Sequence, residues 1–424
     1  MPKKRDHTTE RERSPSGPKC LGMPEDAKTR AVHVIANLDV GGAQEVVRSL
    51  APALSGCGVD ASVLTLRDGP LRHGLEAAGV RVHVVPGRTR SVVRDLGATA
   101  ELLRIRRDVT DVVLRERADI IQTHLLGSMD FLMLGVGTRD RRPSVVWTFH
   151  NAMLDLRPDQ LPAGDRTLVL KRRAYRRAYH HASRLVAAMV AVSGEVGRSV
   201  ARDLRPAPRR LTVIPNGVDI ERYGDTTKRK AVRDSIGVPG GALLLTCVAK
   251  LYEQKGHAVL LDAFERLHAP REVHLALVGD GPLHGSLQAR IDDARLQHRV
   301  HLTGIRSDIP DVLMASDAFL LPSLWEGLPM ALLEAMASGL PIIASRVAGT
   351  EEVLAGTEAG LLVEPGDADG LRDAVERLVA DDGLRLRLGT AARARVVERY
   401  TVAAQAASHA RLYRQVVARR RARR

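Results

Sequence analysis

The chain has 424 residues, which is too long for one ordinary domain and enough for two domains with separate cores. Hydrophobic residues make up 44% and charged residues 27%, as in soluble globular proteins, and no run of 18 apolar residues predicts a membrane-spanning helix. The formal net charge of +14 has two explanations: the base composition of the genome, or an anionic partner such as nucleic acid, an anionic membrane surface or a phosphorylated substrate. An aromatic content of 3% disfavours nucleic acid, because few rings are available for base stacking.

Residues 1–28 are charged and lack the apolar stretch of a secretory signal, so we expect a disordered basic tail and a cytoplasmic protein. Beyond them, short β-branched runs alternate with helical stretches. The first series of runs is 31–38, 61–66, 80–85, 119–124, 144–150, 184–193 and 211–217, and the second is 243–251, 273–281, 299–304, 318–323, 341–345 and 360–366. Such runs predict buried parallel strands, so we expect doubly wound α/β domains at 29–222 and 223–400, followed by a last helix at 401–424.

The fourth run of the second series is followed by two glutamates, Glu326 and Glu334. Pro329 predicts the first turn of a helix, which places Glu326 in the loop before the helix and Glu334 inside it. Ligands bind beyond the carboxyl ends of parallel strands, and amides near Gly327 and Leu328, at the helix N-terminus, attract phosphate. Carboxylates beside a phosphate would repel it but would accept hydrogen bonds from sugar hydroxyls. The pattern therefore predicts a nucleotide-sugar site; the alternative is that Glu326 stabilises the helix start and Glu334 is exposed to solvent.

Lysines and glycines follow other strands of the same series. Lys250 and Lys255 could neutralise a diphosphate leaving group without a metal, and the alternative is that both are solvated surface residues. The segment 278–285 resembles a dinucleotide-binding loop, but its glycine spacing is wrong for one. The segment 366–370 contains Asp-x-Asp, a metal motif of another transferase fold, but its position before a helical stretch predicts an ordinary helix cap. We therefore expect no metal and no cofactor.

Several of these segments resemble glycosyltransferase family 4, the retaining transferases of the GT-B fold. They are "VAKLYEQKG", "LVGDGP", "VIPNGVD", the long segment from "HLTGIRSD" to "LPIIAS", and, in the N-terminal half, "LDVGGAQEVV", "DIIQTH" and "AVSGEV". The resemblance extends over about residues 31–400. It implies two Rossmann-like domains with the active site in the cleft between them, and a last helix that crosses back to the N-terminal domain.

The resemblance implies roles for the matching residues of the C-terminal half. Glu334 would hold the ribose hydroxyls of the donor, and Glu326 with the amides of Gly327 and Leu328 would hold the donor sugar. Lys250 and Lys255 would hold the diphosphate, and a loop would seat the base. That loop is formed by Gly304, Ile305 and Arg306.

In the N-terminal half, Gly41 and Gly42 would let the backbone approach the donor. His124 would face the donor sugar, and His124, Lys250, Lys255 and Glu326 form the expected catalytic set. Gln44 and His150 are expected on the acceptor side. Two residues depart from the family pattern: Lys250 stands where relatives commonly have Arg, and Gln44 where many have Glu.

By resemblance, the expected reaction moves a sugar from a nucleotide-sugar donor, with a UDP-sugar favoured over a GDP-sugar, and retains its anomeric configuration. The acceptor would be a glycan or a lipid-linked molecule in polysaccharide or glycoconjugate synthesis. Front-face displacement assisted by the departing diphosphate is the preferred mechanism, because no residue stands out as a covalent nucleophile. The alternatives are a nucleotide-sugar epimerase or sugar phosphorylase of the same fold, and a non-enzymatic basic protein that binds nucleic acid.

The stretch 170–185 predicts an amphipathic helix with one strongly basic face. At 100° per residue its apolar set falls on one side. That set is Leu170, Ala174, Tyr175, Ala178, Tyr179, Ala182 and Leu185. Either the apolar face packs on the N-terminal sheet and the basic face is merely solvated, or the basic face meets anionic lipid. In the second case the protein would be peripheral at the inner face of the membrane.

Overall fold

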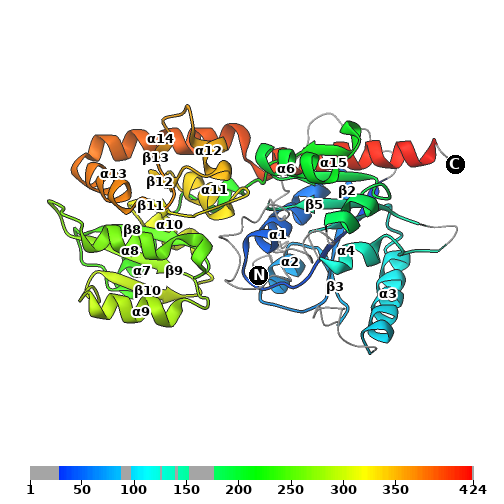
Figure 1. The fold of residues 1–424 in the computed structure, drawn as a ribbon, viewed down its shortest axis with the longest axis horizontal. Helices are drawn as coiled ribbons and strands as arrows, with labels where there is room; N and C mark the ends of the chain where they lie inside the picture. Colours follow the sequence, from blue (N-terminus) through cyan, green and yellow to red (C-terminus); the bar gives the residue numbers. More distant parts are fainter. Residues whose placement is uncertain (1–27, 87–96, 125–126, 139–141, 152–175, 423–424) are drawn as a thin grey trace, which may run out of the picture.

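A computed structural model describes residues 28–86, 97–124, 127–138, 142–151 and 176–422. Two parallel sheets, each covered by helices, form the two halves of the molecule (Figure 1). This arrangement confirms the predicted pair of doubly wound α/β domains, and every predicted run contains a strand. Of the tail expected to be disordered, 1–28, residues 1–27 lie outside the described residues.

The N-terminal sheet has seven strands in the order β3-β2-β1-β4-β5-β6-β7, all paired in parallel. Its strands are β1 (Thr29–Ile35), β2 (Val59–Thr65), β3 (Arg81–Val84), β4 (Ile120–Thr123), β5 (Ser144–Phe149), β6 (Ala188–Ala191) and β7 (Leu211–Val213). The strand order reverses between β1 and β4, and in such sheets the ligand crevice forms beyond that reversal.

The C-terminal sheet has six parallel strands in the order β10-β9-β8-β11-β12-β13. They are β8 (Leu243–Val248), β9 (Val273–Val278), β10 (Val300–Gly304), β11 (Ala318–Leu321), β12 (Ile342–Ser345) and β13 (Gly360–Val363). Here the order reverses between β8 and β11, so the loops that follow these two strands flank the expected crevice.

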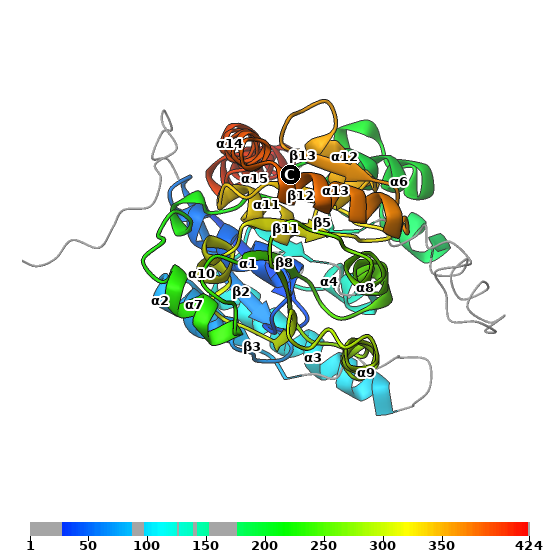
Figure 2. The same ribbon diagram turned by 90° about the vertical axis from the view of Figure 1, so that its left-hand side faces the viewer.

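Helices connect the strands in both halves. In the N-terminal half they are α1 (Gly42–Ser55), α2 (Leu71–Ala77), α3 (Gly97–Arg115), α4 (Ser128–Met133) and α6 (Gly194–Leu204). In the rest of the chain they are α7 (Arg229–Ile236), α8 (His257–Glu265), α9 (His284–Asp293), α10 (Ile309–Ala315), α11 (Met330–Ala337), α12 (Ala348–Leu354), α13 (Ala368–Ala380), α14 (Asp382–Arg399) and α15 (Val402–Arg421). Short 3-10 turns occupy η2 (Pro208–Arg210), η3 (Ile220–Arg222) and η4 (Glu253–Lys255). Figure 2 shows helices on both faces of the C-terminal sheet, with α7 and α10 opposite α8 and α9.

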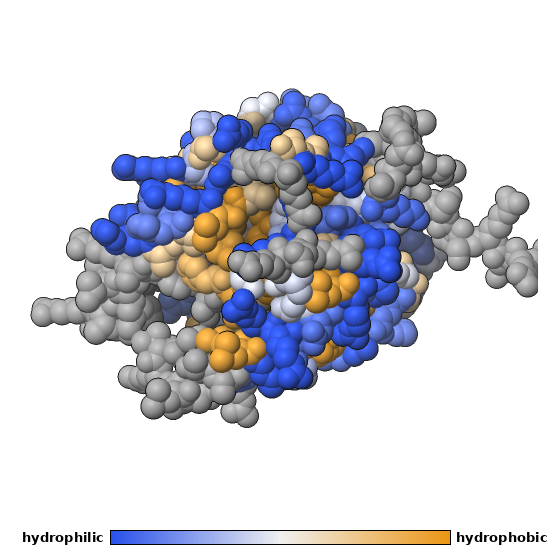
Figure 3. All heavy atoms as spheres, turned by 90° about the vertical axis from the view of Figure 1, so that its right-hand side faces the viewer, coloured by the Kyte–Doolittle hydropathy of each residue, from blue (hydrophilic) through white to orange (hydrophobic). Residues whose placement is uncertain are grey.

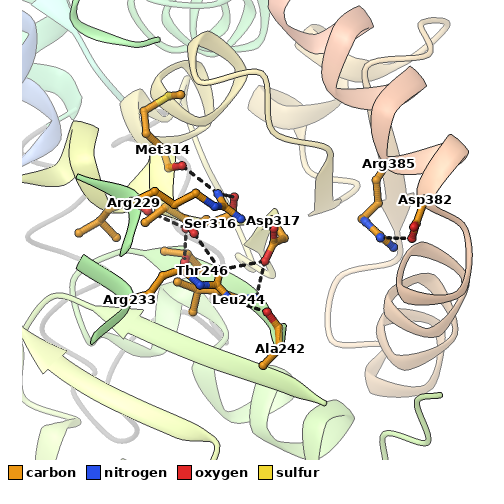
Figure 4. A network of polar contacts seen from close by, with 12 residues as sticks. Arg229, Arg233, Ala242, Leu244, Thr246, Met314, Ser316, Asp317, Asp382 and Arg385 are labelled. Atoms are coloured by element: carbon orange, nitrogen blue, oxygen red, sulfur yellow. Dashed lines mark hydrogen bonds and ion pairs between the residues drawn. The ribbon is translucent and has the colours of Figure 1, made fainter. Parts of the chain in front are cut away.

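A partly buried acidic residue, Asp317, fixes one of these helices at the amino edge of the C-terminal sheet. Its carboxylate accepts hydrogen bonds from Arg229 at 2.6 Å and Arg233 at 3.1 Å, both on α7, and from the Leu244 amide at 2.7 Å (Figure 4). Arg233 also donates to a main-chain carbonyl, that of Ala315, at 3.0 Å. The network lies at the edge opposite the loops that carry the predicted site, so its role is to hold α7 on the sheet.

The last helix, α15, packs on the N-terminal sheet although α14 belongs to the C-terminal half (Figure 1). Its buried residues Ala406, Ala410 and Tyr413 join an apolar cluster formed by the strands and first helix of the N-terminal half. The chain crosses at Thr401, which forms a parallel bridge with Val218 of the first connection between the halves. The two connections therefore run side by side. Figure 3 shows the end of the molecule formed by the N-terminal half, a mostly hydrophilic face interrupted by apolar areas.

The predicted amphipathic helix at 170–185 is described only from residue 176, and its helical part ends at residue 182. Tyr179 and Ala182 are buried in the domain core, as the packing alternative predicts. The assignment of Ala178 and Leu185 to the packed face is wrong, because both are exposed and Leu185 is 73% exposed. Leu185 departs from the helical pattern because residues 183–185 form a turn. In the parts of the chain that the structure describes, no helix is long and apolar enough to cross a membrane.

Candidate active site

The loops after β8, β9 and β10 are held together by close backbone packing. The Gly279 amide donates to the Gly304 carbonyl at 2.9 Å, and a Cβ atom on Gly279 would lie 2.1 Å from the Ala249 carbonyl oxygen. The φ of Gly279 is +143°, which side chains rarely tolerate, so glycine is required here. This packing fixes the backbone beside Lys250, whose side chain is exposed.

Lys255 and Glu326 meet at the point where the strand order reverses between β8 and β11. The Lys255 ammonium forms an ion pair with the Glu326 carboxylate, and Ser323 Oγ donates to the same carboxylate oxygen at 2.8 Å. The Glu326 side chain is only 5% exposed. Cation and carboxylate thus occupy one desolvated corner, where each can also contact a ligand that carries both phosphate and hydroxyl groups.

These contacts argue against the alternative in which Glu326 serves the helix start. Helix α11 begins after Pro329 without a side-chain cap, and the Glu326 carboxylate is instead occupied by Lys255 and Ser323. The second half of that alternative, an exposed Glu334, is wrong because Glu334 is buried within α11.

Glu334 faces the N-terminal half across the domain boundary. Burial, followed by the nearby Glu45 carboxylate of α1, raises the pKa of Glu334 to about 8, and Arg48 opposes the shift. Glu45 is itself paired with Arg48 and, at 3.1 Å, with Arg222. A buried carboxyl that is protonated near neutral pH can donate as well as accept a hydrogen bond, which suits a pair of sugar hydroxyls.

The glycine-rich turn before α1 approaches the same corner from the N-terminal domain. A Cβ atom on Gly41 would lie 3.3 Å from Lys250 Nζ, so this turn and the lysine of the other domain are neighbours. Gly42 is the first residue of α1 and is exposed. The Gln44 side chain lies against Gly41 and donates to Asn37 Oδ1 at 2.8 Å.

The loop before α11 touches the N-terminal domain at the end of β5. A Cβ atom on Gly327 would lie 2.1 Å from the His150 carbonyl oxygen, so no side chain fits there. The carbonyl of the next residue, Leu328, accepts a hydrogen bond at 3.0 Å from Asn216, on the connection between the domains. The two halves of the predicted site are therefore in direct contact.

Three histidines form a hydrogen-bonded row that ends at this contact. His33 lies in β1, and His124 and His150 directly follow β4 and β5. His33 Nδ1 lies 3.0 Å from His124 Nε2, and His124 Nδ1 lies 3.0 Å from His150 Nε2. Burial lowers the pKa of His33 to about 3 and that of His150 to about 4, and it holds the pKa of His124 well below its ordinary value. All three rings are therefore neutral near pH 7.

Both nitrogens of His124 are engaged by the other two rings, and the residue is 3% exposed. The ring that lies partly open is His150, which sequence reasoning placed on the acceptor side. His33 was missed, since a histidine inside a strand resembles an ordinary core residue. The parallel register, which sets His33 beside Gln122 of β4, is what brings it into the row.

The predicted base-seating loop lies at the edge of the sheet, after β10. Ile305 is 64% exposed. Arg306 is turned to Asp308, to which it donates two hydrogen bonds at 2.9 and 2.6 Å. The loop is joined to the turn after β9 by the hydrogen bond from the Gly279 amide to the Gly304 carbonyl.

Over the described part of the chain, no group of three or more His, Cys, Asp or Glu side chains is arranged to hold a metal ion. The Asp-x-Asp segment at 366–370 caps a helix, as predicted: Asp367 accepts a hydrogen bond from the Gly370 amide at 2.8 Å at the start of α13. Asp369 pairs instead with Arg266 and Arg372.

Two Rossmann-like domains that face each other through their ligand-binding loops define the GT-B class. Comparison with known proteins agrees with this assignment to the GT-B class. The family model described as glycosyl transferases group 1 matches residues 242–381, and the model of glycosyltransferase family 4 matches residues 40–222. The chain belongs to these glycosyltransferases, as the sequence motifs predicted, and is an enzyme; the non-enzymatic alternative is set aside.

Among curated proteins, the chain is 28% identical over 373 residues to the Escherichia coli UDP-Gal:alpha-D-GlcNAc-diphosphoundecaprenol alpha-1,3-galactosyltransferase, covering 85% of this chain and 90% of that one. It is 28% identical to the 2-deoxystreptamine glucosyltransferase of Streptomyces kanamyceticus, covering 80% and 89% of the two chains. Among solved structures, it superposes on Anabaena HepE in complex with UDP-glucose with a TM-score of 0.74 and 21% identity, covering 93% and 99% of the two chains.

Proposed function

We propose that this glycosyltransferase moves a sugar from a UDP-sugar to a lipid-linked or glycan acceptor in the synthesis of a cell-surface polysaccharide or glycoconjugate, with retention of anomeric configuration. The proposal is carried by the contact between the domains beside the Lys255–Glu326 ion pair. There the Gly327 loop meets the His150 carbonyl, and Gly41 of the N-terminal domain lies beside Lys250. The names of relatives add support, since one uses UDP-Gal and a diphosphoundecaprenol-linked acceptor, and a structural neighbour contains UDP-glucose.

In this proposal the positive charges hold the donor diphosphate and stabilise its departure. Lys250 is free to reach a phosphate, because its side chain is exposed beside the Gly41 turn. Lys255 would exchange part of its contact with Glu326 for a second phosphate oxygen. Preorganised positive charge aimed at a leaving group is commonly the largest contribution to such catalysis.

The carboxylates would bind the two sugars of the donor. Glu334, buried and facing α1, would hold the ribose hydroxyls, and Glu326 would hold hydroxyls of the transferred sugar. Because Glu326 is held by Lys255 and Ser323, we favour front-face displacement assisted by the leaving diphosphate over a covalent intermediate on this carboxylate. The loop Gly304, Ile305 and Arg306 would seat the base, and Gln44 would lie on the acceptor side.

A thermal-shift screen of UDP-, GDP- and ADP-sugars tests the donor assignment. A ligand at 100 times its Kd adds about 2.7 kcal/mol to the free energy of unfolding, so the correct nucleotide raises Tm measurably. We expect the UDP-sugars to raise it most. With that donor and an isolated lipid-linked acceptor, the anomeric coupling constant of the product distinguishes retention from inversion. Turnover of donor without any acceptor would favour an epimerase instead.

We further propose that the protein acts at the cytoplasmic face of the membrane through the surface around residues 176–185. This surface includes the exposed residues Arg177, Arg184 and Leu185, while Tyr179 anchors the helix in the core. Basic residues near an anionic membrane contribute about 1 kcal/mol each. Vesicle flotation should show binding to anionic but not neutral vesicles, and Arg177→Glu/Arg184→Glu should abolish it. Equal flotation of the variant and the wild type would remove the membrane role.

A further inference from the structure

The histidine row connects the cleft to the last helix of the chain. At its inner end, His33 Nε2 lies 3.4 Å from the hydroxyl of Tyr413, which α15 inserts into the N-terminal core. At its outer end stands His150, whose carbonyl oxygen meets the Gly327 loop. The proposed function uses the contact at His150 but gives no role to His33 or Tyr413.

The titratable groups that face the row are few. They are Tyr413 and His409 of α15, and the pKa of His409 is itself lowered to about 4 by burial. No described carboxylate shifts the pKa of any of the three rings. Each ring is therefore neutral and carries one N–H and one lone pair, so the hydrogen bonds along the row must all point the same way.

The direction is set at the inner end. The Tyr413 hydroxyl donates its single hydrogen to Gln122 Oε1, while Gln122 Nε2 donates to Thr148 Oγ1 at 2.7 Å. The Tyr413 oxygen can then only accept a hydrogen bond from His33, so the hydrogen of His33 is on Nε2.

The remaining tautomers follow in order. His33 Nδ1 carries a lone pair, so it accepts from His124 Nε2–H. His124 Nδ1 in turn accepts from His150 Nε2–H. The hydrogen of His150 is thus on Nε2, and its Nδ1 carries a lone pair. Among the described residues, no partner is recorded for that nitrogen.

We propose that Tyr413 and His33 are positioning residues, which fix the tautomers of the row so that His150 Nδ1 offers a lone pair to a substrate hydroxyl. The hydroxyl belongs to the donor sugar or the acceptor, so this assignment rests on the proposed function. The reversed row would place an N–H at the same point and could not accept the hydroxyl hydrogen. The last helix thereby acts on the chemistry of the cleft without touching substrate.

The test is a measurement of imidazole tautomers in the full-length, ligand-free protein. Two-bond ¹H–¹⁵N correlation spectra distinguish protonated from unprotonated ring nitrogens, and loss of signals in His124→Gln and His150→Gln assigns them. We expect all three rings to carry hydrogen on Nε2. Tyr413→Phe keeps the packing but removes the acceptor for His33, so its spectrum should show mixed tautomers at His150. Tyr400→Phe, a buried tyrosine outside the row, is the matched control and should leave the tautomers unchanged.

With substrates, Tyr413→Phe should lower kcat about tenfold while KM for the donor stays within twofold, and Tyr400→Phe should change neither. A wild-type spectrum with hydrogen on Nδ1 of His150 overturns the inference, and it needs no variant to fold. Unchanged tautomers in Tyr413→Phe overturn it as well. The spectra contain no substrate, so a failure of sugar transfer with any donor would count against the proposed function alone.

Discussion

At the scale of single residues, Glu334 makes the free energy of unfolding depend on pH. Its pKa is about 8 in the folded chain against an ordinary value of 4.5, so the folded state binds more protons between these values. The stabilisation is fully present below pH 4.5 and is lost as the pH rises toward 8. The loss is at most about 1.4 kcal/mol per pH unit.

We predict that chemical denaturation of Glu334→Gln shows a flatter dependence of unfolding free energy on pH in this window than the wild type. Glu45→Gln should move the window to lower pH, because it removes the repelling carboxylate of α1. Glu364→Gln, a change at an exposed residue, should leave the slope unchanged. Identical slopes in Glu334→Gln and the wild type would show that Glu334 titrates normally.

The proposed role of Lys255 predicts that the enzyme needs no metal ion. Turnover should survive EDTA, because lysines rather than a cation are proposed to neutralise the departing diphosphate. Lys255→Ala should lower kcat by about 10²-fold, as for other preorganised charges, while the exposed Lys230→Ala should have no effect. Complete loss of activity in EDTA with recovery on adding Mn²⁺ would overturn the lysine assignment.

At the scale of elements, the loop before α11 is the contact through which the domains meet. Gly327→Ala would force its Cβ to within 2.1 Å of the His150 carbonyl, so the domains must separate there. We predict at least a tenfold loss of kcat/KM, measured in initial-rate assays. The control is Gly285→Ala on α9, where an added Cβ meets nothing within 4 Å. If both variants are as active as the wild type, this contact is not needed in the active state.

The elements differ in how far the sequence alone could predict them. The strands were predictable, because each lies in a short β-branched, apolar run, although the edge strands β3 and β7 are only partly buried. The meeting of Lys255 with Glu326 followed from the order in which loops leave a parallel sheet. The histidine row was not predictable, since its direction depends on Tyr413, 380 positions from His33. The exposure of Leu185 was missed because a helical pattern does not reveal where the helix ends.

At the scale of the whole molecule, two chain crossings hold the domains side by side. The bridge between Val218 and Thr401 brings both crossings to one place, and the Asn216 side chain links this region to the carbonyl of Leu328. A donor that contacts Gly41 on one side and Lys250 on the other would add to these contacts and stabilise closure. We propose that the two acidic residues on either side of the Gly327 loop bind different sugars of the donor: Glu334 the ribose and Glu326 the transferred sugar.

Isothermal titration calorimetry of UDP and of an intact UDP-sugar against two variants tests this claim most directly. Glu334→Ala should weaken both ligands by about 0.5–1.5 kcal/mol, because the hydrogen bond between this protonated carboxyl and the ribose is lost in each case. Glu326→Ala should weaken the intact donor more than free UDP, because only the donor carries the transferred sugar. Equal and small losses for both ligands in both variants would contradict these roles of Glu326 and Glu334.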